Sequence, residues 1–417
     1  MEKQALKHHI SKEKEGSYYR LPLNVPAGME EMTVRYSYDR SGNNCVDLGL
    51  CDEKGDFLGW SGSARQEIQI GPYCSTPGYR LTELREGTWF ILVGAYHIPQ
   101  EGLEVCYEIT FRPPGPRWLK GDLHMHSTAS DGQYEPFTLA QRAKKLGLDF
   151  IAVADHNNYC ENLHLPVLPG LTMIPAVEWT HYKGHINFFG VEAPFENSFV
   201  ANTEEQMQKL LSQVAGRDAL ISLNHPKDSF CPYLWEAEEG FHMIEVWNGP
   251  MRPGNLRAAD WWHKLLLAGK KIPVVGGSDF HRDKSPVRLG RPTTFVYTQT
   301  PAVKDICSAL AHGRSFVTSS PNGVRLSIDG ACFGDRCKSQ RGKVWNFRAE
   351  NGGLGMKLRL MTDKGISAEV PFRMDGTAVV AADEDDWRFA YLTVGYKVGA
   401  HFWIRAISNL STECFEV

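Results

Sequence analysis

The sequence predicts an α/β protein in which a barrel of about seven or eight parallel strands lies between two β-sandwich domains. Three successive patterns along the 417 residues support this prediction. Strand-like runs alternate with turn residues in the first part, strand-like and helix-like runs alternate in the middle, and helix-like runs cease after about residue 320. We therefore expect domains at residues 1–114, 115–320 and 321–417.

The first domain is predicted from apolar and aromatic runs that are bounded by polar turn clusters. Between Gly16 and Thr110 these runs include MTVRYSY, TWFILVGAY and LEVCYEITF. Such spacing is typical of a β-sandwich. The segment FRPPGPRW then interrupts strand pairing, because proline has no backbone N–H and forces the residue before it into an extended conformation. This segment predicts a boundary near residue 115.

The middle of the chain alternates two kinds of apolar pattern. Strand-like runs such as DFIAVAD, HINFFGV and IPVVGGSD are separated by helix-like runs such as PFTLAQRAKKLG and TEEQMQKLLSQVAG. Continuous apolar strands indicate burial on both faces, and helices between them indicate parallel pairing. After SPNG at residues 320–323, runs such as VWNFRAEN and HFWIRAIS are again typical of strands and predict a second sandwich.

Composition limits the classes to which the protein can belong. The net charge is -4, with 42% hydrophobic and 23% charged residues, which is ordinary for a globular chain and shows no basic excess for nucleic acid. The start lacks the apolar stretch of a signal peptide, and no run of about 18 apolar residues follows. We expect a cytoplasmic protein with no membrane partner, and nucleic acid only as a nucleotide or short oligonucleotide substrate. The oligomeric state is not predicted.

The cysteines do not indicate a crosslinked or thiolate site. The chain has 10 of them, without a CxxC pair or a short repeating spacing. A disulfide framework is typical of small secreted chains, and a thiolate zinc site needs closely spaced pairs. We therefore expect mostly reduced thiols.

Histidines and carboxylates stand where the predicted strands end. His124 and His126 are separated by one residue, so on a strand their imidazoles share one face. Asp131 follows in a turn that can direct its carboxylate back over the strand end. The other residues at strand ends are His156, Glu178, His225, Asp279 and His281. Because the C-terminal ends of barrel strands form one rim, we expect these side chains to lie together.

This set of side chains predicts a metal site. A single histidine at a strand end is usually a hydrogen-bonded or exposed residue. Burying this many imidazoles and carboxylates without a cation, however, would carry a large desolvation cost. Nitrogen and oxygen donors without thiolates favour zinc, manganese or iron.

The motifs resemble those of the polymerase and histidinol phosphatase (PHP) family. The residues that carry the resemblance are HMH with the following SDG, ADH, the glutamate at the next strand end, NHP and GSDFH. The opening DLHMHSTASDG and the segment RLGRPTTFVY more narrowly resemble the branch grouped with carbaryl hydrolase. The resemblance covers about residues 118–320. It implies a distorted, TIM-like (β/α)7 barrel that holds two or three divalent ions.

The resemblance also implies three sets of metal ligands. The first is His124, His126, Glu178 and Asp279; the second is Glu178, His185 and His225, with His181 as the alternative to His185; the third is Asp131, His156 and His281. Many members of the family have histidine where Asp131 stands. A third site with one nitrogen fewer would bind its ion more weakly, so its occupancy stays open.

Catalysis and substrate binding are expected at the same place. The candidate catalytic residues are Glu178, Asp279, His281 and Arg282. The candidate substrate-binding residues are Arg282, Arg288 and Lys227, because cationic side chains match phosphate oxygens. Asp155 could orient a ligand histidine or accept structural hydrogen bonds.

Three functions are consistent with these residues. The leading hypothesis is a phosphoesterase that hydrolyses a small phosphate mono- or diester, such as a nucleotide or cyclic phosphate, by a metal-bound hydroxide. The second is a carboxyl or carbamate ester hydrolase, which an apolar pocket and dispensable arginines would indicate. The third is a non-catalytic scaffold that metal ions stabilise and that binds a ligand.

Overall fold

The computed structural model describes residues 2–196, 198–284, 286–335, 344–383 and 387–412. The chain forms two compact units, Met1–Gly115 and Pro116–Val417.

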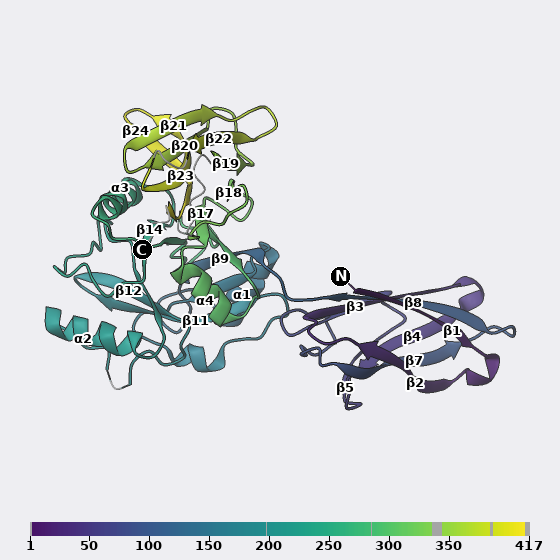
Figure 1. Cartoon of the computed structure of the whole chain (residues 1–417). Helices are drawn as coiled ribbons and strands as arrows, with labels where there is room; N and C mark the ends of the chain where they lie inside the picture. Colours follow the sequence, from purple (N-terminus) through teal and green to yellow (C-terminus); the bar gives the residue numbers. More distant parts are fainter. Residues whose placement is uncertain (1, 197, 285, 336–343, 384–386, 413–417) are drawn as a thin grey trace. The chain divides into compact units, whose positions relative to one another are not determined.

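The first unit is built from two four-stranded antiparallel sheets. Its strands are β1 (Glu2–Ile10), β2 (Ser17–Val25), β3 (Glu31–Tyr38), β4 (Cys45–Cys51), β5 (Phe57–Gly62), β6 (Glu67–Ile70), β7 (Gly87–His97) and β8 (Leu103–Arg112), with the short helices η1 (Lys12–Lys14) and η2 (Ser41–Asn43) (Figure 1). One sheet has the order β1-β8-β3-β6 and the other β2-β7-β4-β5. Alternate residues of β3, such as Met32 and Val34, share one apolar core with Trp89 of β7.

The first part of the second unit alternates strands and helices. Its elements are β9 (Arg117–Met125), α1 (Pro136–Lys145), β10 (Phe150–Val153), η3 (Cys160–His164), β11 (Thr172–His181), β12 (Gly184–Phe189), α2 (Glu204–Ala215), β13 (Leu220–Leu223), β14 (Met243–Asn248), α3 (Pro253–Leu267), β15 (Val274–Gly277), β16 (Thr293–Thr298), α4 (Val303–Ala311) and β17 (Ser315–Thr318). The rest of the unit consists of strands among its described residues. These are β18 (Arg325–Ile328), β19 (Val344–Glu350), β20 (Lys357–Thr362), β21 (Gly365–Pro371), β22 (Ala378–Asp383), β23 (Phe389–Val398), β24 (His401–Ser408) and β25 (Ser411–Thr412).

A single mixed sheet of 14 strands runs through this unit in the order β15-β14-β13-β12-β11-β10-β9-β16-β17-β24-β23-β20-β21, with β25 beside β23. Strands β9, β10 and β11 pair in parallel, as do β13, β14 and β15. Strand β12 is antiparallel to both of its neighbours. The backbone N of His126 donates to Phe280 O (3.0 Å), and Asp279 N donates to His124 O (2.7 Å), so the segment after β15 lies along β9.

The helices cover the strands through apolar stripes. In α2, Met207, Leu210 and Val214 recur at helical spacing and share a core with Phe188 of β12. This helix begins at a capping box, in which the Thr203 side chain and Gln206 satisfy each other's free backbone N–H groups. The connection between β10 and β11 carries His156, and the connection between β13 and β14 carries His225.

The C-terminal strands continue the mixed sheet. Strand β24 pairs with β17 antiparallel, with Phe316 opposite Ser408. The side chain of Asn409 extends this junction: its Oδ1 accepts from Val274 N (2.6 Å), and its Nδ2 donates to Val274 O (2.9 Å) and to Ser315 Oγ (2.8 Å). A separate sheet, β18-β19-β22, packs on the continuation through a common apolar core. The C-terminal residues therefore support β15 directly.

These observations establish an α/β fold with several sheets. A (β/α)7 barrel is not shown, because the sheet is mixed and strands outnumber helices in the described part of the chain. The predicted division at 1–114, 115–320 and 321–417 stays a prediction. Within the residues that the structure describes, no helix has both the length and the apolarity needed to cross a membrane.

Candidate metal centre

The strand ends of the second unit bring the predicted polar side chains to one place. β9 contributes His124 and ends just before His126, while β11 contributes Glu178 and the adjacent β12 contributes His185. His225 follows β13, and Asp279 and His281 follow β15. Asp131 and His156 lie in the connections after β9 and β10. All nine residues predicted as ligands meet in this cluster.

Glu178 lies at the middle of the cluster and is 1% exposed. Its two carboxylate oxygens face five imidazoles. The nitrogen–oxygen distances are 2.8 Å to His156, 3.2 Å to His124, 3.2 Å to His185, 3.5 Å to His225 and 3.6 Å to His126. A carboxylate in this position can contact more than one cation, which fits the bridging role implied by the resemblance.

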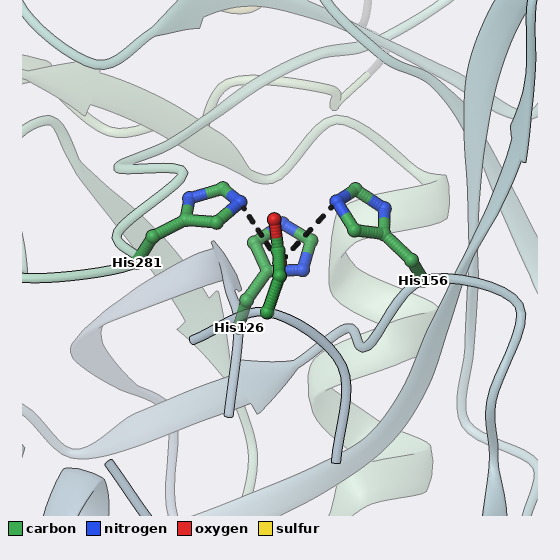
Figure 2. A group of neighbouring side chains, drawn as sticks. His126, His156 and His281 are labelled. Carbon is green, nitrogen blue, oxygen red and sulfur yellow. Dashed lines mark ion pairs between the residues drawn. The ribbon is translucent and has the colours of Figure 1, made fainter. Parts of the chain in front are cut away.

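The potential ligand atoms fall into three groups that overlap the implied sets. They are His124, His126 and Asp279; His185, His225 and Cys231; and His126, Asp131, His156 and His281. Figure 2 shows the rings of His156 and His281 directed toward one another from opposite sides, with His126 between them. In the third group, Asp131 Oδ1 lies 3.3 Å from His281 Nε2 and 3.6 Å from His156 Nε2.

The electrostatics of the cluster favour charged carboxylates. Burial alone would raise the pKa of Glu178, but the neighbouring imidazoles of His124, His156 and His185 hold that pKa well below its ordinary range. Burial would also raise the pKa of Asp279, which His124 and His126 hold well below its ordinary range. Burial lowers the pKa of His126 and so favours the neutral imidazole, the form that binds a metal ion.

Several buried polar atoms of the cluster are poorly paired. His126 Nδ1 has no hydrogen-bond partner, and His124 Nε2 and Glu178 Oε2 contact only other side chains of the cluster, at 3.2 Å and 2.8 Å. Leaving a buried polar atom such as His126 Nδ1 unpaired costs about 1–3 kcal/mol. Because imidazole nitrogens and carboxylate oxygens are ligands for zinc, manganese and iron, the side chains present fit divalent ions.

Further side chains hold the ligands in position. Glu245 Oε1 accepts from His124 Nδ1 (3.0 Å), and Asn224 Nδ2 donates to Glu178 Oε1 (2.9 Å). Asn248 Nδ2 donates to Asp279 Oδ2 (3.3 Å). Such partners fix the tautomer and orientation of metal ligands. Glu245 was not among the predicted residues, although an acidic residue within the apolar run MIEVWN was a signal that it is buried with a partner.

Asp155 and Asp122 organise the loops around the cluster. Asp155 accepts from Ser127 N (2.7 Å), Ser127 Oγ (2.6 Å) and Ser130 Oγ (2.6 Å), so it anchors the turn that carries Asp131 rather than contacting a predicted ligand. Asp122 accepts from Ser278 N (2.8 Å), which joins β9 to the loop after β15. Burial raises the pKa of Asp122 to about 6.

The backbone is strained at two of the predicted ligands. His225 has φ of 28° and Asp279 has φ of 54°, in the left-handed region that most side chains avoid. Such conformations persist where the surrounding structure enforces them, often at functional sites. Gly277, two residues before Asp279, allows the close approach of β15 to β9, since a Cβ there would lie 2.3 Å from His124 Cβ.

The structure distinguishes His185 from His181. His185 Nδ1 lies 3.2 Å from Glu178 Oε1, whereas the ring of His181 stacks on Trp179 at 5.6 Å. Cys231, which the sequence did not single out, joins His185 and His225; its Sγ lies 3.7 Å from His225 Nδ1. The only sequence signal for Cys231 was its position six residues after His225.

The three predicted substrate-binding cations lie in different surroundings. Arg282 Nη2 donates to Asp131 O (3.2 Å), which brings its guanidinium beside the third ligand group. Arg288 Nη1 donates to Asp283 O (3.1 Å), and Lys227 Nζ lies 4.4 Å from the centre of the Trp261 ring. Arg252 was not among the predicted cations; its Nη2 donates to Asn248 Oδ1 (2.7 Å), which itself belongs to a side chain that contacts Asp279.

A cavity of about 550 Å³ adjoins the cluster. His185 and Cys231 belong both to its lining and to the second ligand group. The rest of its lining is mainly aromatic and aliphatic, and includes Trp179, Tyr182, Phe199 and Phe230. A substrate held at the cluster could therefore extend an apolar part into this cavity.

Comparison with known proteins agrees with this geometry. Residues 122–242 match the model of the PHP domain. The chain is 44% identical over 54 residues to the DNA polymerase/3'-5' exonuclease PolX of Bacillus subtilis, covering 13% of this chain and 9% of that protein. It is 29% identical over 146 residues to the 5'-3' exoribonuclease Rnm of Salmonella typhimurium, covering 32% of this chain and 43% of that protein. The chain thus spans less than half the length of these curated relatives.

Among solved structures, the chain is similar to a two-domain protein from Bacteroides vulgatus that contains a predicted PHP-like metal-dependent phosphoesterase. The identity is 18%, the TM-score is 0.43, and the match covers 71% of this chain and 97% of that chain. The expectation of a metal-dependent hydrolase is supported by the PHP match together with the side-chain groups that could hold metal ions. The match to the PHP domain lies within the second unit and includes His124, His126, Glu178 and His225.

Proposed function

We propose that this protein is a metal-dependent phosphoesterase that hydrolyses a small phosphate mono- or diester, such as a nucleotide or cyclic phosphate. The observation that carries the proposal is the position of Glu178, a buried carboxylate among five imidazoles with three overlapping groups of potential ligands around it. The similarity to an exonuclease and an exoribonuclease supports a phosphate ester as the substrate.

The proposed ligands follow the three implied sets. His124, His126, Glu178 and Asp279 would hold one ion, Glu178, His185 and His225 a second, and Asp131, His156 and His281 a third. Zinc, manganese or iron, when bound there, would lower the pKa of a coordinated water and neutralise charge on the phosphoryl oxygens. The wider arrangement we propose is a distorted (β/α)7 barrel of the branch grouped with carbaryl hydrolase.

The protein's own residues would position the ions and the substrate. Glu245 would hold the proton of His124 on Nδ1 and so leave Nε2 to ligate an ion, and Asn248 donates to Asp279 and orients it. His281 would act with Asp279, since its Nδ1 donates to Asp279 O (2.9 Å). Arg282, beside Asp131, is the best placed of the predicted cations to contact a phosphate.

A second candidate function is the hydrolysis of a carboxyl or carbamate ester. The apolar cavity beside His185 favours it, because an aryl ester would need such a pocket. Substitution of Arg282 by alanine separates the two functions. A phosphate substrate requires the guanidinium, whereas an aryl ester does not.

The test is a comparison of four substrates with protein of known metal content, reconstituted with manganese or zinc. They are p-nitrophenyl phosphate, bis-p-nitrophenyl phosphate, thymidine monophosphate p-nitrophenyl ester and p-nitrophenyl acetate. We expect metal-dependent turnover of one or more of the phosphates, its loss in Glu178→Gln, and no change in Glu238→Gln, a control at a surface carboxylate that is 40% exposed. Turnover of the acetate alone would favour the second candidate, and no turnover with the ions bound would contradict both.

A further inference from the structure

We propose that the substrate carries an uncharged aromatic ring, and that this ring binds in the cavity beside His185 and Cys231. The inference deepens the proposed function and rests on it for the position of the phosphoryl group. We call this cavity the ring pocket and define it by six of its lining residues, Trp179, His181, Tyr182, Phe199, Val200 and Phe230.

The rim of the ring pocket exposes large apolar side chains. Tyr182 is 99% exposed, Phe230 94% and Val200 63%. These residues come from three separate segments of the chain, yet all line the same cavity. Single exposed apolar residues are common on proteins, but a group around a hollow is typical of a binding site. Since these side chains add little to the core, their role in folding is small.

Two of the three segments that carry the rim are held by hydrogen bonds to the rest of the protein. Trp179 Nε1 donates to Phe199 O (2.7 Å), which ties the segment before α2 to strand β11. Asp228 Oδ1 accepts from Phe230 N (2.7 Å), and Asp228 Oδ2 lies 2.9 Å from Arg252 Nη2. Phe230 is therefore displayed on an anchored turn. A preorganised pocket loses less entropy on binding than a mobile one.

The chemistry of the lining selects the kind of group that enters. Among the described residues, the lining contains no aspartate, glutamate, lysine or arginine, so a charged group would lose its hydration without gaining an oppositely charged partner. The rings of Trp179 and His181 stack with an interplanar angle of 12°, and because Trp179 is 1% exposed, His181 is the more accessible ring of this pair. Flat aromatic surfaces favour offset or edge contacts with another ring. The volume of about 550 Å³ accommodates such a ring.

The ring pocket is continuous with the metal cluster. His185 lines it while lying 3.2 Å from Glu178, and Cys231 lines it while lying 3.7 Å from His225. A molecule whose anionic end meets the ligand groups can thus place its neighbouring ring in the pocket. Aryl phosphates and nucleotides share this chemistry.

Binding of non-hydrolysable phosphonates tests the proposal independently of turnover. Phenylphosphonate and methylphosphonate are titrated by calorimetry into the metal-reconstituted full-length protein. We expect phenylphosphonate to bind about tenfold tighter or more, because the phenyl ring removes more apolar surface from water. Phe230→Ala and Tyr182→Ala should each reduce this preference several-fold and leave methylphosphonate binding unchanged. Phe137→Ala, at a 52% exposed phenylalanine on α1, is the matched control.

The outcomes separate this inference from the proposed function. Three results would overturn the proposal that an aromatic ring binds in the ring pocket. They are equal affinity for the two phosphonates, no binding of either, and a preference for phenylphosphonate that persists in both Phe230→Ala and Tyr182→Ala. A preference that both substitutions reduce, found in a protein that turns over no phosphate ester, would support the pocket and reject phosphoesterase activity. Thymidine 5'-methylphosphonate identifies the source of the ring: tighter binding than phenylphosphonate indicates a nucleobase, and weaker binding indicates a simple aryl group.

Discussion

Replacing Glu245 by glutamine should weaken metal binding without changing the shape of the site. His124 Nδ1 lies 3.0 Å from Glu245 Oε1, and the two side chains are 0% and 3% exposed. If Nε2 of His124 binds a metal ion, the ring proton must be on Nδ1, where the carboxylate of Glu245 would accept it. The other oxygen of Glu245 accepts from His225 N (3.2 Å) and Asn248 Nδ2 (3.1 Å).

Glutamine cannot accept hydrogen bonds from all three donors that Glu245 meets, which are His124 Nδ1, His225 N and Asn248 Nδ2. If its carbonyl oxygen faces His225 and Asn248, its NH₂ group faces His124 Nδ1 and moves the imidazole proton to Nε2, where it blocks ligation. If the carbonyl oxygen faces His124, three donor groups meet with no acceptor. Either arrangement costs about 1–3 kcal/mol, the cost of an unsatisfied buried polar group. We therefore expect metal affinity to fall about 10- to 100-fold.

The assay is competition for zinc or manganese between the apoprotein and a chromophoric chelator. Glu238→Gln serves as the control, because Glu238 pairs with Lys270 at the surface at 3.8 Å. Circular dichroism checks that each variant is folded. Metal affinity within about twofold of the parent in a folded Glu245→Gln protein would refute the conclusion that this carboxylate fixes the tautomer of His124.

Three further predictions concern the same region. Asp279→Asn should reduce metal-dependent turnover by about 100-fold or more, because asparagine lacks the negative charge beside His126. The melting temperature should change little, because asparagine tolerates the φ of 54°. Unaltered turnover would contradict the assignment of Asp279 as a ligand. Gly277→Ala should lower the free energy of unfolding, measured in urea, by about 1–3 kcal/mol, because the added Cβ would lie 2.3 Å from His124 Cβ. The control Gly353→Ala, whose Cβ would have its nearest neighbour at 3.8 Å, should lower it less. Equal decreases in the two variants would argue against the close approach of β15 to β9. Removal of ions with a chelator should lower the melting temperature by several degrees, and added zinc or manganese should restore it, because ions that bind only the folded state stabilise that state. A melting temperature that changes neither with the chelator nor with added metal would indicate that no ion binds at the cluster.

Much of the candidate site was predictable because its residues obey a local rule. His124 and His126 alternate on a strand, and Glu178, His225 and Asp279 stand where apolar runs end. The structure brings these residues together, while their roles as ligands stay predictions. The choice of His185 over His181 could not be made from spacing, because it depends on how β11 and β12 pair: Glu178 is opposite Asn187, and the β12 residue His185 is opposite Thr180.

The residues that the sequence did not reveal act through tertiary contacts. Arg252 precedes α3 in an ordinary loop, and only the folded chain brings it to Asn248 and Asp228. Cys231 likewise meets His225 because the Asp228 turn folds back. The alternation of strands and helices predicted an α/β fold, but it gave no sign that β12 runs antiparallel or that β24 pairs with β17. Strand order depends on long-range pairing that local patterns do not encode.

The hydrogen bonds of Asn409 have a consequence for the order in which the protein matures during synthesis. This residue holds both backbone groups of Val274 in β15, the strand that leads to Asp279, from 135 positions further along the chain. A ribosome releases the chain from its N-terminal end, and domains generally fold as they emerge. The strand that presents Asp279 gains these bonds only after Asn409 has left the exit tunnel. Completion of the candidate metal centre is thus coupled to the synthesis of Asn409, and a nascent chain arrested before this residue would hold its histidines without this support.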